Sequence, residues 1–318
     1  MSQRPAPARR ASLLPAILGV LAVLAIVAAV LFFLLGQQRG QVGASPSPVR
    51  SPSPFATQRL NAELLNRRWT VLVVGLDVNQ TRAERGEPVN TDALQLVSLS
   101  EDQSELAIIG VPRDLTDIPL PDGSTWDGKV NAIYRERDLE TLRDAMAALF
   151  EVEIDAHVVL DMDDFRTVVE GVGGIDVEPD EPLADPRVDL SLEPGPQELD
   201  GTTALAYVRT RVDQDYGRVR RQGEVILAVI ERLADPTREV DVDALVDDLD
   251  SLQTDLPLDE LPTLVELARR AADAGVEHLV LEPPDYIGFE GDRGDGSGYI
   301  LEPNIDAIRE AATRLIDE

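Results

Sequence analysis

The sequence predicts an α/β fold in which a mixed β-sheet is layered with helices, preceded by one transmembrane helix and a disordered linker. From residue 69 onward, strand-like runs and runs with helical spacing follow one another without the strict alternation of a parallel sheet. Before that point, residues 11–36 contain no charged side chain. The chain has 318 residues, of which 43% are hydrophobic, so it can bury a substantial core in one or two domains.

The uncharged segment at residues 11–36 is long enough to span a hydrocarbon layer of about 30 Å as a helix. Arginines crowd its N-terminal flank and are sparser beyond it, at Arg39 and Arg50. The positive-inside rule therefore predicts a cytoplasmic tail at residues 1–10, a single crossing of the cell membrane and an extracytoplasmic C-terminal domain. A cleaved signal peptide is the alternative, but the run exceeds the ~7–15 apolar residues of such segments and lacks a clear cleavage pattern.

Residues 37–68 are predicted to be a Ser/Pro-rich linker and the lead-in to the folded domain. Two Ser-Pro-Ser-Pro repeats occupy residues 45–48 and 51–54. A low-complexity stretch of this kind cannot bury apolar area and runs as an extended spacer. The linker is therefore expected to hold the domain off the membrane.

Residues 69–235 carry the main predicted domain. The continuous apolar run at 70–76 is typical of a buried strand, and the alternating run at 94–99 is expected to pair with 106–111 across a polar turn. Apolar residues at helical spacing predict a helix over 139–150. The other expected elements are strands at 157–160 and 175–177 and helices at 163–172, 201–208 and 218–233.

Residues 236–318 are predicted to form a C-terminal α/β extension that packs on the same domain. Helices are expected at 242–249, 258–274 and 305–316, and short strands at 279–281 and 299–301. The acidic residues between 241 and 259 are typical of a solvated helix face. The glycine-rich segment 288–298 resembles a calcium loop but lacks the spacing of an EF-hand.

Charge and cysteine content exclude several classes of function. The chain has 59 acidic and 29 basic residues, a formal net charge of -30, two histidines and no cysteine. Thiol catalysis, disulfides, cysteine zinc sites and iron–sulfur clusters are excluded, so a metal site would have to be built from carboxylates. No nucleic-acid partner is expected, because a dense line of phosphates needs a basic surface.

Two aspartates are the candidate metal ligands. Asp77 ends the first predicted strand and Asp92 begins the next. If these strands are neighbours, both carboxylates can face one crevice and hold a hard cation such as Mg²⁺. The alternative is that each is a solvated turn residue at a strand end.

Five arginines fall within 13 residues of this acidic chain, at positions 209, 211, 218, 220 and 221. The guanidinium fork can bond two phosphate oxygens at once. Tyr216-Gly217 are expected to break the segment before Arg218 opens a helix, whose N-terminal amides also attract anions. The alternative is a helix face paired with Asp213, Asp215 and Glu224. Lys129, the only lysine, is a further candidate for a phosphate contact.

Six motifs follow one another in order between residues 69 and 235. They are Val71-Leu72-Val73-Val74-Gly75-Leu76-Asp77 with Thr91-Asp92, Val111-Pro112-Arg113-Asp114, Lys129-Val130-Asn131-Ala132-Ile133-Tyr134, Gly171-Val172-Gly173-Gly174-Ile175-Asp176-Val177, Leu199-Asp200-Gly201 through Ala204-Leu205-Ala206-Tyr207-Val208-Arg209-Thr210-Arg211, and Asp215-Tyr216-Gly217-Arg218 with Arg221-Gln222. This series resembles the LytR-CpsA-Psr family of bacterial cell-envelope proteins, whose topology is also one N-terminal anchor and an external domain.

The resemblance implies an enzyme that takes a glycopolymer from a polyprenyl-pyrophosphate carrier and attaches it to peptidoglycan through a phosphodiester. It implies Mg²⁺ as cofactor, with Asp77 and Asp92 as ligands. The residues it implies as catalytic are Arg113, Arg209, Arg211, Asp215 and Arg218. Those it implies as binding the pyrophosphate are Arg113, Lys129, Arg209, Arg211, Arg218 and Gln222. These roles suit phosphoryl transfer, which relies on positioned cations to absorb charge.

A prenyl tail would require an apolar groove between sheet and helices. The groove is expected to be lined by residues that share apolar spacing, namely Leu142, Met146, Leu149, Phe150, Phe165 and Val169. The alternative for each of them is ordinary core packing.

The sequence departs from the family pattern beside the second aspartate. Where the family usually has Arg-x-Asp-Thr, this chain has Asn90-Thr91-Asp92-Ala93. Arg82 or Arg85 of the preceding loop could supply the missing guanidinium. The alternative is a catalytically weak protein that binds polyprenyl phosphate or acts as an envelope scaffold. A transcriptional regulator finds no support, since the tail of about ten residues has no room for a DNA-binding helix.

Overall fold

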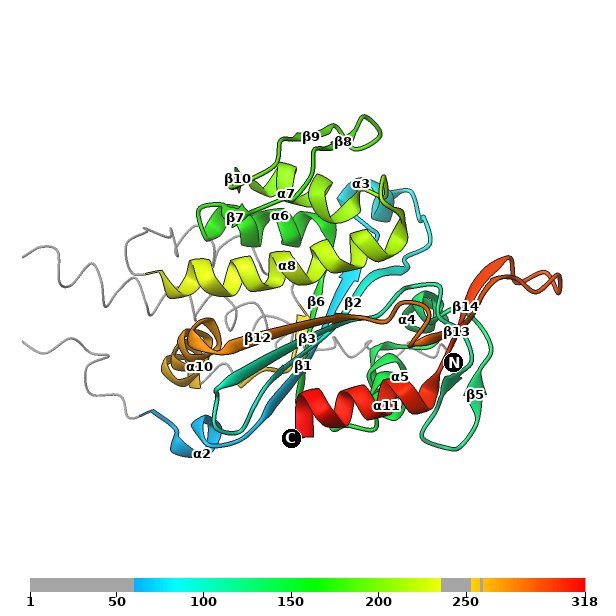
Figure 1. Ribbon diagram of the computed structural model, residues 1–318, viewed down its shortest axis with the longest axis horizontal. Coiled ribbons are helices and arrows are strands. Elements are labelled where there is room, and N and C mark those ends of the chain that lie inside the picture. The colour runs from blue at the N-terminus through cyan, green and yellow to red at the C-terminus, as the bar shows by residue number, and fades with distance from the viewer. Residues whose placement is uncertain (1–59, 236–252, 258–259, 318) are drawn as a thin grey trace, which may run out of the picture.

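A six-stranded mixed β-sheet forms the centre of the fold (Figure 1). The structure is a computed structural model that describes residues 60–235, 253–257 and 260–317. The strands of the sheet are β1 (Trp69–Leu76), β2 (Thr91–Leu99), β3 (Glu105–Gly110), β6 (Ala156–Leu160), β11 (Gln253–Thr254) and β12 (Gly275–Val280). Their order is β11-β6-β1-β2-β3-β12. The pairs β1–β6 and β3–β12 are parallel, and the other neighbours are antiparallel.

Helices cover both faces of this sheet. They are α5 (Leu139–Phe150) and α11 (Ile305–Ala312) on one face, and α8 (Gln214–Ala234) and α10 (Leu261–Asp273) on the other (Figure 1). Because side chains alternate along a strand, Leu72 and Val74 of β1 pack into the core with α5 and α11. On the opposite face, the Gln95 side-chain amide of β2 donates to the Val219 carbonyl of α8 at 3.0 Å. Gly110 allows this close approach, since a Cβ there would lie 2.5 Å from Val219 Cγ1.

A further layer lies beyond α8, at the top of Figure 1. It contains two helices, α6 (Met162–Gly171) and α7 (Gly201–Arg209), and two short antiparallel pairs, β7 (Ile175–Val177) with β10 (Gln197–Leu199) and β8 (Leu183–Asp185) with β9 (Leu190–Leu192). The N-terminus of α6 is fixed by a capping box, in which the Asp161 side chain accepts from the backbone amides of Asp163 and Asp164.

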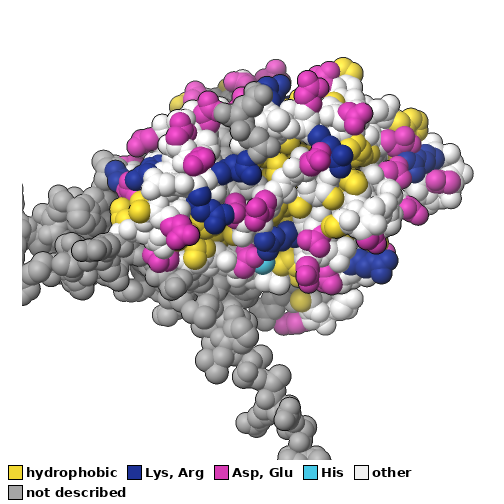
Figure 2. Space-filling model, turned by 90° about the horizontal axis from the view of Figure 1, so that it is seen from below, with side chains coloured by type: hydrophobic (Ala, Val, Ile, Leu, Met, Phe, Trp, Pro, Cys, Tyr) yellow, Lys and Arg dark blue, Asp and Glu magenta, His cyan; other side chains and the backbone are white. Residues whose placement is uncertain are grey.

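A hairpin of β13 (Ile287–Asp292) and β14 (Tyr299–Pro303) projects from the end of the molecule opposite α10 (Figure 1). The remaining elements are α2 (Ala62–Leu65), α3 (Gln80–Glu84), β4 (Ile118–Pro119), β5 (Thr125–Trp126), a 3-10 turn at Val130–Ala132, α4 (Ile133–Glu136) and a final π-helical turn at Thr313–Asp317. Acidic side chains are spread widely over the face seen in Figure 2, as the net charge of -30 leads one to expect.

The predicted class, a mixed sheet layered with helices, is confirmed. The C-terminal elements belong to the same body as the rest, because β12 pairs with β3 at the sheet edge and α11 covers one face. Strand β13 (Ile287–Asp292) runs through the first half of the glycine-rich segment 288–298. Residues 62–65 of the predicted linker form a short helix.

Several predictions lie outside the described residues. These are the cytoplasmic tail, the transmembrane helix at 11–36, the Ser-Pro repeats and the helix at 242–249. Among the helices that the structure does describe, none is both long and apolar enough to cross a membrane.

Candidate active site

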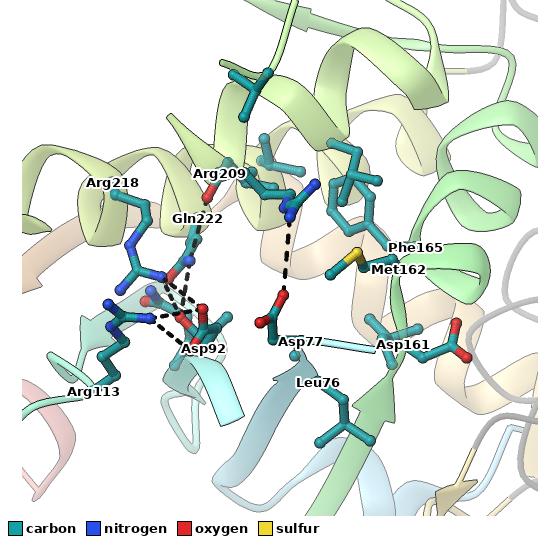
Figure 3. A pocket seen from close by; sticks show the side chains of 18 of the residues that line it. Leu76, Asp77, Asp92, Arg113, Asp161, Met162, Phe165, Arg209, Arg218 and Gln222 are labelled. Atoms are coloured by element: carbon teal, nitrogen blue, oxygen red, sulfur yellow. Dashed lines mark hydrogen bonds and ion pairs between the residues drawn. The ribbon is translucent and has the colours of Figure 1, made fainter. Parts of the chain in front are cut away.

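Asp77 and Asp92 face one cavity, as the strand order predicts. β1 and β2 are antiparallel neighbours, with Leu76 opposite Thr91, so the end of one strand meets the start of the other. The Asp77 amide donates to the Asn90 carbonyl at 2.9 Å. Both carboxylates line a cavity of about 390 Å³ between the sheet and helices α6, α7 and α8 (Figure 3). The prediction that the two acids share a crevice is therefore confirmed.

Arginines from three segments converge on Asp92, and two of them, Arg113 and Arg218, are labelled in Figure 3. Arg113 Nη1 donates to both carboxylate oxygens of Asp92 at 2.9 Å. Arg218 Nη1 donates to the Asp92 backbone oxygen at 2.8 Å, and Gln222 Nε2 approaches the same oxygen at 3.3 Å. Arg211 Nη2 lies 3.4 Å from Asp92 Oδ2. The fold thus brings together four residues that the sequence places up to 109 positions apart.

Asp77 is held by two other arginines. Arg82 Nη1, from α3, lies 2.7 Å from Asp77 Oδ2, and Arg209 Nη2 lies 3.9 Å from Oδ1. Of the two loop arginines that could replace the family arginine, Arg82 therefore contacts a candidate metal acid. Arg85 is instead exposed and 3.8 Å from Glu87. The Asn90 side chain accepts a hydrogen bond from Arg135.

The last two predicted site residues, Asp215 and Lys129, lie close to the cavity but do not line it. Asp215 Oδ2 accepts from Arg218 Nη2 at 2.9 Å, and its Oδ1 lies 3.5 Å from Arg211 Nε. Lys129 is not among the residues that line the cavity. Its Nζ bonds Asp114 Oδ1 at 2.6 Å, one residue beyond Arg113.

The cavity wall concentrates positive charge in an acidic chain. Five arginines and four aspartates line it, against a net charge of -30 for the whole sequence. Burial lowers the pKa of Arg211, and the neighbouring charges of Arg218 and Arg113 lower it further. Burial also acts to lower the pKa of Arg113, but Asp92 and Asp114 more than offset it and the pKa is raised. An anion entering this cluster would relieve the repulsion among the guanidinium groups.

Some buried donors and acceptors here make no hydrogen bond within the described chain. They are Arg113 Nε, Arg218 Nε and Gln222 Oε1. Since buried polar atoms are nearly always paired, this concentration of unpaired atoms favours a site that is completed by a ligand.

The inner part of the cavity is apolar. Its wall is made by β1, β6, α6, α7 and α8 through Val73, Leu160, Met162, Phe165, Leu205, Val208, Val225 and Ile226. Of the residues predicted to line a prenyl groove, Phe165 does so. The others are core residues, which corrects the prediction: Val169 is a buried residue of α6, and Leu142, Met146, Leu149 and Phe150 are buried residues of α5. Helical spacing identifies an apolar face but not the side of the sheet on which it packs.

The turn between α7 and α8 presents Arg209 and Arg211 and is fixed from behind. Arg221, 5% exposed, donates to the carbonyls of Tyr207 and Thr210 at 3.0 and 2.6 Å. Its Nη1 also bonds Asp213 Oδ2 at 2.6 Å. The Thr210 hydroxyl donates to Asp185 at 2.7 Å. Arg221 therefore positions the turn rather than facing the cavity. In the same way, Arg220 turns outward to Glu282 at 3.2 Å.

The prediction that Arg218 opens a helix is wrong. Helix α8 already begins at Gln214, and Arg218 lies in its second turn. Gly217 does not break the helix, because its missing side chain makes room for Asp213, whose Oδ2 would lie 2.0 Å from a Cβ. The buried Arg218 thus contributes a guanidinium, not a helix N-terminus, to the site.

A carboxylate magnesium site fits this donor set only together with a ligand. The described residues contain no group of three or more His, Cys, Asp or Glu side chains placed to hold a metal ion. Asp77 and Asp92 supply two hard oxygen ligands on one cavity. Magnesium is commonly held by one or two carboxylates together with substrate phosphates and water, so the pair fits that arrangement.

An arginine-rich mouth that opens on an apolar interior has the charge and shape of a site for an amphiphilic anion.

The family model described as the LytR_cpsA_psr family matches residues 42–314, and the chain belongs to this family.

Two curated relatives show the extent of the similarity. One is the "Polyisoprenyl-teichoic acid--peptidoglycan teichoic acid transferase TagV" of Bacillus subtilis, 24% identical over 80% of this chain and 66% of the relative. Another is the TagU protein of the same description from Halalkalibacterium halodurans, 29% identical over 76% of each chain. The chain spans just under two thirds of the TagV relative and 44% of the "Biofilm regulatory protein A" of Streptococcus mutans.

Solved structures share the fold. The crystal structure of B. subtilis TagV is 22% identical, with a TM-score of 0.63 over 79% of this chain and 98% of that one. The structure described as "TagT bound to LIIa-WTA" is 21% identical, with a TM-score of 0.63 over 81% and 92% of the two chains. The expected family and its fold are thereby confirmed.

Proposed function

We propose that this protein is an extracytoplasmic phosphotransferase that attaches a glycopolymer from a polyprenyl-pyrophosphate carrier to peptidoglycan in cell wall biogenesis. The observation that carries the proposal is the single cavity in which an arginine-rich mouth continues into an apolar interior. A prenyl pyrophosphate has the same two parts, an anionic head and an apolar tail. The names of the relatives, which describe transferases of teichoic acid to peptidoglycan, support the same activity.

The residues that line the cavity have different roles, which follow from their positions. Arg113, Arg211 and Arg218 bind the pyrophosphate oxygens around Asp92, and Arg209 reaches the same head group from the side of Asp77. The apolar wall holds the first prenyl units and excludes water. As an acceptor hydroxyl attacks the glycan-side phosphorus, the bond to the bridging oxygen breaks, the hydroxyl proton is released, and polyprenyl phosphate leaves on the arginines that already hold it.

Asp77 and Asp92 would hold Mg²⁺ together with the pyrophosphate. Bound Mg²⁺ supplies charge neutralisation at the phosphate oxygens during the displacement. Arg82 and Arg113, which pair with these carboxylates, would then donate to the phosphates. Lys129 would reach the outer part of the head group, beyond Asp114.

The function is tested with the full chain in detergent micelles, a radiolabelled glycopolymer on polyprenyl pyrophosphate, Mg²⁺ and peptidoglycan. Label should enter the insoluble peptidoglycan while polyprenyl phosphate is released. Arg113→Ala should lower this transfer by about 10²-fold, as removal of one charge-stabilising donor does elsewhere. Arg220→Ala is the matched control, because Arg220 lies in the same cluster of sequence but faces solvent and Glu282. Equal loss in both variants would contradict the assigned site.

The second candidate is a protein that binds the carrier lipid or scaffolds the envelope with weak turnover. It is favoured by Asn90, which stands where the family arginine is expected. The ion pair from Arg82 to Asp77 favours the enzyme instead. Tight lipid binding by the wild type without labelled product from any donor would establish the binding protein.

The location of the site is part of the proposal. The arginine-flanked apolar run at residues 11–36 would anchor the chain once in the cell membrane with residue 1 in the cytoplasm. A reporter fused after Glu318 should then be active only in an extracytoplasmic compartment. Activity confined to the cytoplasm would contradict this topology.

A further inference from the structure

The β13–β14 hairpin is tied to the loop that carries Arg113. The Leu301 amide of β14 donates to the Asp114 carbonyl at 3.0 Å, and the Thr116 amide donates to the Leu301 carbonyl at 2.9 Å. Leu301 is buried, so the base of the hairpin is part of the core. The projecting hairpin is therefore fixed directly beside the arginine-rich mouth of the cavity.

One face of the hairpin joins the mouth through two tyrosines and a glutamate. Tyr216, the residue after Asp215 in α8, donates from its hydroxyl to Glu290 Oε2 at 3.2 Å. Tyr299 donates to Glu290 Oε1. Burial and Glu290 raise the pKa of both tyrosines, and Asp114 and Asp215 raise that of Tyr299 further.

This surface, which we call the tyrosine rim (Tyr216, Glu290 and Tyr299), offers a ring and a carboxylate to the solvent. Tyr299 is 50% exposed although it is a large hydrophobic side chain. Exposed aromatic rings with a nearby polar group are typical of recognition surfaces. The Glu290 oxygens accept hydrogen bonds and retain lone pairs for further donors.

The charge around the rim differs in sign from that of the cavity. The hairpin carries Glu290, Asp292, Asp295 and Glu302. Its single arginine, Arg293, bonds Glu302 at 2.7 Å and also Asp117. A pyrophosphate or another polyanion is repelled by such a surface. A neutral, hydroxyl-rich ligand is suited to it, since hydroxyls donate to carboxylates and the apolar face of a sugar ring packs on an aromatic ring.

We propose that the tyrosine rim binds an uncharged segment of the N-acetylated acceptor glycan and presents a hydroxyl of that glycan to the cavity mouth. The proposal rests on the proposed transferase function, which requires an anionic donor and an acceptor to meet at one phosphorus. The arginine cluster selects the donor by its charge. The acidic rim, formed by Tyr216 of α8, Glu290 of β13 and Tyr299 of β14, excludes the donor from the acceptor side.

The hairpin supplies its own control. Phe289 is 39% exposed, and as the neighbour of Glu290 in β13 it points to the opposite face. Its ring lies over Gly291, where a Cβ would be 3.2 Å from Phe289 Cζ. Phe289→Ala and Tyr299→Ala thus each remove one exposed ring from the same hairpin, but only Tyr299 belongs to the rim.

The test titrates chitohexaose, a neutral N-acetylated glycan, into the full chain in detergent micelles by calorimetry. Tyr299→Ala should weaken binding about five- to tenfold, the scale of one hydrogen bond together with one packed ring. Tyr299→Phe, which keeps the ring, should lose only part of this. Phe289→Ala should bind as the wild type does. Binding of polyprenyl pyrophosphate should be the same in all four proteins.

Absence of chitohexaose binding by the wild type, or equal loss in Tyr299→Ala and Phe289→Ala, would overturn the proposal. So would a Tyr299→Ala variant that loses binding of an anionic teichoic acid but not of chitohexaose, because the rim would then hold the donor glycan. Failure of the transferase function is distinguishable: no transfer with any donor, yet Tyr299-dependent binding of chitohexaose, would leave the rim a glycan site on a protein without that activity.

Discussion

Two pairs of arginines from one 13-residue stretch behave in opposite ways. Arg218 and Arg221 are 2% and 5% exposed, and their bonds to Asp92, Asp215, Tyr207, Thr210 and Asp213 are all 3.0 Å or shorter. Arg209 and Arg211 have side chains 45% and 37% exposed, and their nearest carboxylates are 3.4 to 3.9 Å away. The buried pair is fixed to the protein, and the exposed pair is loosely held at the cavity mouth.

This difference in burial and contact distance shows that arginines clustered in the sequence need not share one role. Buried arginines that donate to backbone carbonyls stabilise local geometry, because the carbonyls would otherwise lose their partners. Half-exposed arginines with long contacts keep donors available for an anion. Arg218 joins both roles, since it is buried but lies on the cavity wall beside Asp92. Variants of the two groups test the division into positioning and ligand-binding arginines.

The largest effect on the free energy of unfolding is expected for Arg221→Ala. The variant leaves the carbonyls of Tyr207 and Thr210 without their hydrogen-bond donor and no longer fixes the α7–α8 turn. The free energy of unfolding should therefore fall by about 3 kcal/mol. Thermal unfolding of the full chain measures it, with Arg220→Ala as control, since Arg220 makes only an exposed ion pair worth about 1 kcal/mol or less. If Arg221→Ala unfolds like the wild type yet loses lipid affinity, Arg221 binds the lipid, and the distinction between positioning and ligand-binding arginines is wrong.

Asp92→Asn should come next, with a loss of Mg²⁺-dependent turnover of about 10²-fold or more and an intact fold. Asparagine keeps the shape and accepts hydrogen bonds from arginine, but hard cations select charged oxygen ligands. Transfer is measured as a function of Mg²⁺ concentration. Unchanged metal dependence would return Asp77 and Asp92 to the role of strand-end residues that only anchor arginines.

Arg211→Ala should weaken binding of a polyprenyl pyrophosphate by about 1.5–3 kcal/mol, the scale of a charge-assisted contact. The free energy of unfolding should change little, because the Arg211 side chain is 37% exposed and its ion pairs are long. Arg211→Ala should therefore lose lipid affinity and keep its stability, whereas Arg221→Ala should lose stability and keep its lipid affinity. A variant that loses stability instead of affinity would contradict the distinction between the two groups.

The sequence predicted this site well where neighbours in the chain are neighbours in space. Asp77 and Asp92 meet because an antiparallel pair joins the end of one strand to the start of the next, so spacing alone was informative. The composition also identified the arginine cluster. It could not identify which arginines face inward, since positions 218, 220 and 221 lie on one helix and their direction depends on the sheet against which α8 packs.

Features that depend on contacts between distant parts of the chain could not be predicted from the sequence. The apolar spacing of α5 was read correctly as helical, but Leu142 and its neighbours pack on the sheet face away from the cavity. The role of Asp185 could not be found, because its partner Thr210 lies 25 positions away. The hairpin at 287–303 was missed in part, since glycines and acidic residues interrupt its alternation and its support comes from the backbone of Asp114 and Thr116.

A smaller effect, about tenfold in turnover, is expected for Arg82→Ala. We propose that Arg82, whose Nη1 lies 2.7 Å from Asp77 Oδ2, supplies the guanidinium that is missing at Asn90. Loss of one such charge near the transferred phosphoryl group costs about 1.4 kcal/mol in the transition state. Asn90→Arg should change the wild type little but restore the Arg82→Ala variant. Arg85→Ala is the matched control, and an equal loss there would assign the effect to the loop as a whole.

The smallest effect concerns His278, which lies under α8 against Gly223, where a Cβ would be 2.2 Å from its Nε2. Burial lowers the pKa of His278 below its usual 6.5, and Arg220 lowers it further. The unfolded chain therefore binds a proton more readily than the folded one, so stability is fully present above pH 6.5 and decreases as pH falls below it. Thermal unfolding at pH 7.5 and 5.5 should show a wild-type loss that His278→Gln reduces by less than about 1 kcal/mol. Arg220→Ala should reduce the loss in the same direction, because it removes the cation that opposes protonation. If His278→Gln leaves the pH dependence unchanged, the pKa of His278 is the same in the folded and unfolded chains, and neither burial nor Arg220 acts on it.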